Sequence, residues 1–195
     1  SKLIERGKMT LEDREVLLGR IQVIDQVEQS ADAALFIEAI VEDLEIKRGL
    51  FQTIESFASN NAILATNTSS ISVTKIATAV SDPSRVVGMH FFNPAPVMKL
   101  VEVVRGQQTD EAVAKKVFEY AQGWGKTAVY TQSTPGFIVN RVARPYYGEA
   151  LRLVEEGLAK VPVIDALMRD CGGFRMGPFQ LMDLIGIDIN FSVSE

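Results

Sequence analysis

Two patterns of apolar and polar residues follow each other along the chain. Up to about residue 132, short apolar runs typical of buried strands alternate with segments that have the spacing of an amphipathic helix. The predicted strands are 21–24, 33–41, 62–66, 86–92, 100–104 and 126–130. The predicted helices are 2–18, broken at Gly7 and capped again at Thr10, then 44–58, 72–80 and 110–123. Such an alternation predicts βαβ units and a mostly parallel sheet.

After Pro135-Gly136 the strand pattern stops. Helical spacing continues over 137–156, 163–171 and 178–185, and no further strand is predicted. The predicted fold class is therefore α/β, with one domain over 1–132 and the start of an all-helical domain over 133–195.

Composition narrows the classes of function. The 195 residues include 47% hydrophobic and 23% charged ones, which is ordinary for a globular protein. The net charge of −5 argues against a nucleic-acid partner, because such proteins present a basic face. No apolar run approaches the roughly 18–20 residues that span a bilayer, so no membrane contact is expected. One His and one Cys are too few for a zinc site.

The single histidine, His90, is the first candidate for chemistry. It ends an apolar strand, and ligands of open α/β sheets bind beyond the carboxyl ends of the strands. Glu102 lies in the next strand, which is otherwise apolar, and a buried carboxylate is costly unless it is paired. If the two strands are neighbours, Glu102 can fix the tautomer of a His90 general base. The alternatives are a core histidine and an edge glutamate that faces water.

Other polar residues are ambiguous by position alone. The cluster 67–70 follows a predicted strand, where it either contributes to a site or caps the next helix. Asn140, early in a long helix, needs a partner if it is buried. Glu42 and Lys47 flank the start of a helix, near where a ribose or nicotinamide can lie, or they are ordinary surface charges.

The chain contains no G-x-G-x-x-G turn, the phosphate-binding signature of dinucleotide-binding sheets. The alternatives are that the chain binds no nucleotide or that its first βαβ unit lies before Ser1. The opening helix has no preceding strand to cross over from, which favours a missing unit.

Five segments, taken together, resemble the 3-hydroxyacyl-CoA dehydrogenases. They follow the family's order and span nearly the whole chain: 38–42 (EAIVE), 67–70 (NTSS), 88–102 (GMHFFNPAPVMKLVE), 134–141 (TPGFIVNR) and 176–183 (MGPFQLMD). The resemblance implies a partial Rossmann-type NAD-binding domain followed by a truncated helical domain that forms a homodimer. It also implies a cytoplasmic enzyme that oxidises an acyl-CoA substrate with NAD.

The resemblance also implies roles for single residues. His90 takes the proton of the substrate's 3-hydroxyl, and Glu102 orients and stabilises it. Ser69 and Asn140 bind the substrate near the reacting carbon. The implied contacts to NAD come from Glu42, Lys47 and Asn93, with Ser69 near the nicotinamide.

The segments 143–153, 173–178 and 183–191 are most similar to the phenylacetate-degradation branch, which acts on 3-hydroxyadipyl-CoA. Without the Gly-rich turn and the acidic ribose ligand of the family, the chain alone is expected to be inactive. One alternative is a member that keeps the fold for a structural or binding role without catalysis. Another is a β-hydroxyacid dehydrogenase of similar architecture, but its lysine-based site does not fit His90 and Glu102.

Overall fold

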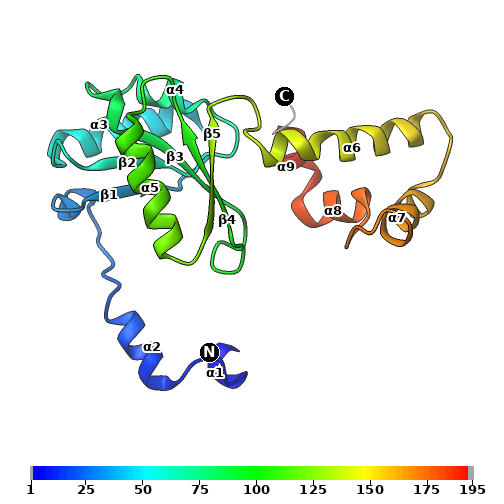
Figure 1. The fold of residues 1–195 in the computed structure, drawn as a ribbon, viewed down its shortest axis with the longest axis horizontal. Coiled ribbons are helices and arrows are strands. Elements are labelled where there is room, and N and C mark those ends of the chain that lie inside the picture. Colours follow the sequence, from blue (N-terminus) through cyan, green and yellow to red (C-terminus); the bar gives the residue numbers. More distant parts are fainter. Residues whose placement is uncertain (1, 193–195) are drawn as a thin grey trace.

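A five-stranded sheet forms the centre of the first part of the chain. The computed structural model describes residues 2–192. Its strands are β1 (Leu35–Glu38), β2 (Ile63–Thr66), β3 (Val86–Phe91), β4 (Leu100–Arg105) and β5 (Thr127–Gln132), in the spatial order β1-β2-β3-β4-β5 (Figure 1). Only β3 and β4 pair antiparallel, and the other neighbours are parallel. The predicted, mostly parallel sheet is therefore confirmed.

Helices cover both faces of this sheet. The α3 (Leu44–Phe57) and α4 (Val73–Ala77) helices share one core with Leu64 of β2, whereas α5 (Glu111–Gly123) shares the other with Ile63 and Ala65. Successive side chains of a strand point to opposite faces, so the continuous apolar run of β2 fills both cores. Short 3₁₀ turns, η1 (Val27–Ser30) and η2 (Pro83–Arg85), precede β1 and β3.

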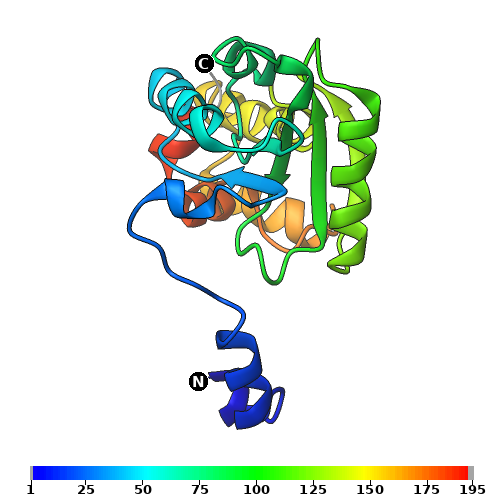
Figure 2. The same cartoon turned by 90° about the vertical axis from the view of Figure 1, so that its left-hand side faces the viewer.

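The N-terminal segment stands away from the sheet in both views (Figures 1 and 2). It contains α1 (Lys2–Glu5) and α2 (Leu11–Leu18), and Thr10 caps α2 as predicted. The strand predicted over 21–24 is wrong, because the chain there is irregular and Val23 is 88% exposed. An apolar alternation forms a strand only beside another strand, and none pairs with this segment in the described structure.

The second part of the chain is helical, as predicted. It contains α6 (Val139–Glu155), α7 (Val161–Asp170), α8 (Pro178–Ile185) and α9 (Ile187–Ser192), of which α9 was not expected. The α6 helix leads away from the sheet, α8 packs beside it, and α7 packs against α8 (Figure 1). The buried Asp165 of α7 accepts hydrogen bonds from the Phe179 and Gln180 amides, which caps α8 and joins the two helices.

Candidate active site

The antiparallel pairing of β3 and β4 places His90 directly opposite Glu102. His90 Nδ1 lies 2.7 Å from Glu102 Oε2. Both side chains are buried, with His90 4% and Glu102 0% exposed. The alternative of an edge glutamate that faces water is thus wrong, and the neighbouring strands expected from the sequence are present.

This hydrogen bond determines which nitrogen of His90 can accept a proton. An ionised carboxylate only accepts hydrogen bonds, so Nδ1 carries the proton of the neutral ring and Nε2 keeps a free lone pair. Within residues 2–192, no hydrogen bond occupies Nε2. The rings of Phe92 and Phe137 pack against the imidazole, at centroid distances of 4.6 and 5.7 Å, and limit its rotation.

The other oxygen of Glu102 lies at the start of α6. Oε1 accepts hydrogen bonds from the amides of Ile138 and Val139, each at 2.9 Å. Gly136 (φ +71°) and Phe137 (φ +48°) form the turn that aims these amides at the carboxylate. Phe137 is a non-glycine residue in the left-handed region, a conformation typical of functional sites.

Burial alone would raise the pKa of Glu102. The hydrogen bonds from His90, Val139 and Ile138 outweigh burial, so the pKa lies below its ordinary value. The positive end of the α6 dipole acts in the same direction. Glu102 is therefore a permanent negative charge at neutral pH, able to stabilise His90 once it is protonated.

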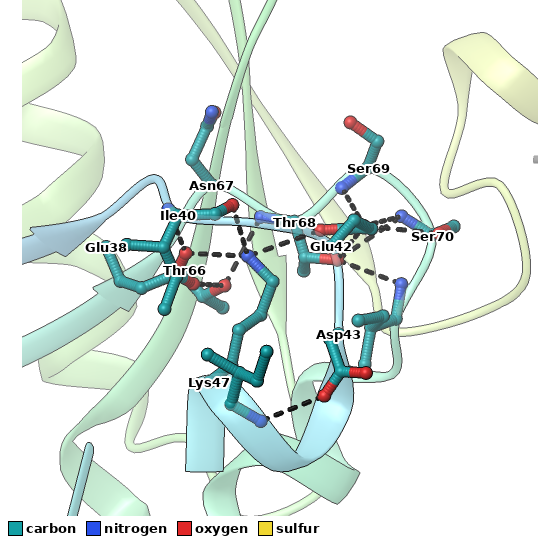
Figure 3. A network of polar contacts seen from close by, with 12 residues as sticks. Glu38, Ile40, Glu42, Asp43, Lys47, Thr66, Asn67, Thr68, Ser69 and Ser70 are labelled. Carbon is teal, nitrogen blue, oxygen red and sulfur yellow. Dashed lines mark hydrogen bonds and ion pairs between the residues drawn. The ribbon is translucent and has the colours of Figure 1, made fainter. Parts of the chain in front are cut away.

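A second polar network joins the ends of β1 and β2 (Figure 3). Glu42 Oε1 accepts hydrogen bonds from Thr68 Oγ1 (2.5 Å), Ser69 N (2.8 Å), Ser70 N (3.1 Å) and Ser70 Oγ (3.2 Å). One carboxylate thus holds the whole turn, and the Ser69 hydroxyl points away from it (Figure 3). The cluster 67–70 is therefore held from the β1 side and is more than a cap for the next helix.

Lys47 holds Glu42 from the other side. Its Nζ lies 3.2 Å from Glu42 Oε2 and 2.6 Å from Glu38 Oε1. The Lys47 side chain is 1% exposed, so the alternative of an ordinary surface charge is wrong for this residue.

The loop 67–70 touches the other two parts of the site. Asn67 Oδ1 accepts a hydrogen bond from Phe91 N (2.8 Å), the residue after His90. The Ser69 carbonyl accepts one from Asn140 Nδ2 (3.2 Å). These bonds bring Ser69 and Asn140, two candidates far apart in sequence, into contact.

Among the described residues, Asn93 is the candidate that no side-chain hydrogen bond joins to the others. It is exposed and lies in the turn after β3. Two contributors were not singled out from the sequence, Glu38 and Phe137, and Asn67 was singled out only as a member of the cluster 67–70. A carboxylate inside the apolar run 33–41 was a signal for Glu38, and the Pro-Gly break was one for the turn at Phe137.

The carboxyl ends of β1 and β2 fit the nicotinamide half of an NAD molecule. Exposed Ile40 and Val41 offer an apolar surface to a flat ring, and the partly exposed Glu42 and Ser69 offer polar groups beside it. Among residues 2–192, no three His, Cys, Asp or Glu side chains are placed to hold a metal ion. Nor does this part contain a helix both long and apolar enough to cross a membrane.

Comparison with known proteins identifies two successive domains. Residues 1–134 match the model of the 3-hydroxyacyl-CoA dehydrogenase NAD-binding domain, and residues 136–195 match that of the C-terminal domain of the same family. NAD, the cofactor predicted from the sequence, is therefore the cofactor of the matched domain.

Individual relatives agree with this result. The 3-hydroxyadipyl-CoA dehydrogenase of Escherichia coli is 52% identical over 98% of this chain and 40% of its own length. A probable 3-hydroxybutyryl-CoA dehydrogenase of Bacillus subtilis is 43% identical over 98% of this chain and 67% of its own. The crystal structure of a (S)-3-hydroxybutyryl-CoA dehydrogenase from Ralstonia eutropha has a TM-score of 0.96 at 38% identity, covering 98% of this chain and 68% of that one.

The chain thus spans between 40% and about two thirds of the length of these relatives. Two family domains in sequence cover nearly all of it, and the same fold recurs in the solved relative. The chain belongs to the 3-hydroxyacyl-CoA dehydrogenase family.

Proposed function

We propose that the whole protein oxidises a 3-hydroxyacyl-CoA to the 3-oxoacyl-CoA with NAD, using His90 as general base. The observation that carries this proposal is the 2.7 Å bond between His90 and Glu102, which leaves Nε2 free to accept a proton. Support also comes from the family and from relatives named for this oxidation.

In this proposal each site residue has a separate role in the reaction. His90 Nε2 takes the proton of the 3-hydroxyl, and Glu102 stabilises the imidazolium that forms. Ser69 Oγ and Asn140 hold the substrate oxygen so that the C3–H bond points at the cofactor. When bound, NAD supplies the hydride acceptor, with Glu42, Lys47 and Asn93 assigned to its side of the site.

The finer substrate proposal is 3-hydroxyadipyl-CoA, as in phenylacetate catabolism. An apolar cavity of about 600 Å³ runs along α6 beside Ile138 and Val139, the residues whose amides hold Glu102. Arg175 is the one charged residue that lines it among residues 2–192, and it suits an acyl chain that ends in a carboxylate. The 52% identical relative named 3-hydroxyadipyl-CoA dehydrogenase supports this choice.

The assembly is also a proposal. Several apolar side chains of α6 are exposed, among them Val142 at 73%, and they support a homodimer formed by the helical domain. The division into 1–132 and 133–195 is supported by the end of β5 at Gln132. A cytoplasmic location stays a prediction.

The test is hydride transfer by the full-length protein. NADH oxidation is followed by absorbance with 3-oxoadipyl-CoA and with acetoacetyl-CoA as substrates. Turnover of both supports the oxidoreductase. A higher kcat/KM for 3-oxoadipyl-CoA than for acetoacetyl-CoA supports the phenylacetate-degradation branch if the Arg175→Met variant loses this preference. No turnover by well-folded protein would favour the non-catalytic alternative. Light scattering of the same sample tests the dimer.

A further inference from the structure

Lys126 lies between the end of α5 and the start of β5. Gly125 closes the helix with a φ of +74°. Its amide donates to the Gln122 carbonyl (2.9 Å), and the Lys126 amide donates to the Ala121 carbonyl (3.0 Å). Together these two bonds form a Schellman motif, a common end of α-helices. The backbone therefore fixes the point from which the Lys126 side chain extends.

The loop 92–99 connects β3, the strand that carries the base, to β4. Pro94 and Pro96 have no N–H group, so the loop can make few hydrogen bonds of its own. The Pro94 carbonyl accepts bonds from the amides of Val97 (2.9 Å) and Met98 (3.0 Å), which close a single turn. A loop with so few internal bonds depends on contacts from outside to keep one shape.

Lys126 supplies such a contact. Its Nζ donates hydrogen bonds to the Ala95 carbonyl and to the Met98 carbonyl, the latter at 2.9 Å. Hydrogen bonds from a charged donor are stronger than those between neutral groups, and Lys126 is half-buried. One ammonium group thus joins two points of the turn to the start of β5. The loop and the end of α5 lie at the same end of the sheet in both views (Figures 1 and 2).

Aromatic rings hold the start of the loop. Trp124 stacks on Phe91, the last residue of β3, with 6.5 Å between the ring centroids. Phe92 packs against His90 at a centroid distance of 4.6 Å. The exposed Asn93 follows directly. Asn93 therefore lies between two fixed points, the ring pairs before it and the tethered turn after it.

We propose that Lys126 is a positioning residue, which holds the loop 92–99 so that the Asn93 side chain reaches NAD. This inference rests on the proposed function, in which Asn93 contacts the cofactor. Lys126 acts on cofactor binding through the backbone of the loop, and Asn93 makes the contact itself.

The test uses four variants of the full-length protein. Lys126→Met keeps most of the side chain and removes the three donors of the ammonium group. Asn93→Ala removes the proposed contact with NAD, and Lys126→Met/Asn93→Ala removes both. Lys116→Met is the matched control, because Lys116 is an exposed lysine of α5. Urea unfolding establishes that each variant is folded.

Fluorescence titration with NADH measures whether Lys126 acts through Asn93. Loss of one hydrogen bond to the cofactor should raise the Kd of Asn93→Ala about three- to tenfold. Lys126→Met should raise it by a similar factor, and the double variant should bind no more weakly than Asn93→Ala. Lys116→Met should match the wild type. Two losses that multiply in the double variant would overturn the proposal, because the residues would then act independently. So would a wild-type Kd in Lys126→Met.

Steady-state kinetics tests a second explanation, direct contact of Lys126 with the acyl-CoA. Under the proposal, the KM of Lys126→Met for NADH rises with its Kd, and the KM for acetoacetyl-CoA stays within about twofold of the wild type. A raised KM for acetoacetyl-CoA with an unchanged KM for NADH would indicate direct contact and overturn the proposal.

Hydrogen exchange tests the tether without NADH. The Val97 and Met98 amides bond inside the turn, so a peptide spanning 92–99 should exchange faster in Lys126→Met. A peptide spanning α3 should be unchanged. Equal exchange of the 92–99 peptide in the wild type and Lys126→Met would contradict the inference. If the wild type binds NADH without turnover, the proposed function fails, while titration and exchange still decide this point.

Discussion

Replacing Glu102 by Gln moves the proton of the neutral His90 ring from Nδ1 to Nε2 and leaves the shape of the site nearly intact. The Ile138 and Val139 amides both donate to Oε1, so the side-chain amide oxygen of the Glu102→Gln variant must take that position. The NH₂ group of the variant then faces His90 Nδ1, where Oε2 lies in the wild type. Because NH₂ only donates, Nδ1 must give up its proton and Nε2 must carry one.

The expected loss in rate follows from this tautomer. A carboxylate-to-amide exchange that fixes the wrong tautomer of a catalytic histidine costs about 10⁴-fold in kcat in a serine protease. At about 1.4 kcal/mol for each factor of ten, this corresponds to roughly 5 kcal/mol of transition-state stabilisation. The loss in folding stability is smaller, about 1–3 kcal/mol, because only the charge of a buried, hydrogen-bonded group disappears.

The assay is steady-state NADH oxidation by full-length Glu102→Gln, with urea unfolding of the same preparation. Glu119→Gln is the matched control, since Glu119 is an exposed carboxylate of α5. Two results would refute the reasoning. One is a folded Glu102→Gln protein with kcat within about tenfold of the wild type. The other is an equal loss in Glu119→Gln.

Three further predictions concern stability. The pKa of Glu102 lies below its unfolded value of 4.5, so its charge stabilises the fold fully above about pH 4.5 and this contribution is lost as the pH falls through the folded-state pKa. The urea stability difference between wild type and Glu102→Gln should therefore shrink between pH 6 and pH 3.5, and a constant difference would contradict this linkage. Gly88→Ala places a Cβ 2.6 Å from Val104 Cβ and should lower the free energy of unfolding by about 1–3 kcal/mol; an unchanged urea midpoint would contradict the tight packing of β3 on β4. Gly136→Ala places a Cβ 2.9 Å from Arg141 N at a positive φ and should cost about 1–3 kcal/mol and also lower kcat; wild-type kcat would show that the turn does not aim the amides at Glu102.

Much of the fold was predictable because the apolar runs of buried strands differ clearly from the helical spacing of apolar residues in this chain. The runs around Leu64, Val87 and Val103 are long and apolar enough to mark buried strands. The segment around Val23 has a similar local pattern but no strand beside it in the described structure. Strand formation there depends on a distant partner, which a local pattern cannot contain.

The candidate site was predictable where residues able to do acid–base chemistry lie in strands that follow each other along the chain. His90 and Glu102 lie in consecutive strands, so a simple hairpin-like return places them together. The contacts of Glu38 could not be predicted from the sequence. Its partners Lys47 and Thr66 lie 9 and 28 residues away along the chain. Backbone donors such as Ile138 N carry no sequence signature, since any residue at the start of α6 provides one.

The most direct test of the central claim, that His90 is the base, is the kcat of full-length His90→Gln in NADH oxidation with a 3-oxoacyl-CoA. Loss of a general base that is hydrogen-bonded to a buried carboxylate predicts a fall of about 10³-fold or more, with NADH binding unchanged by fluorescence titration. A folded His90→Gln protein that keeps kcat within about tenfold of the wild type would contradict it.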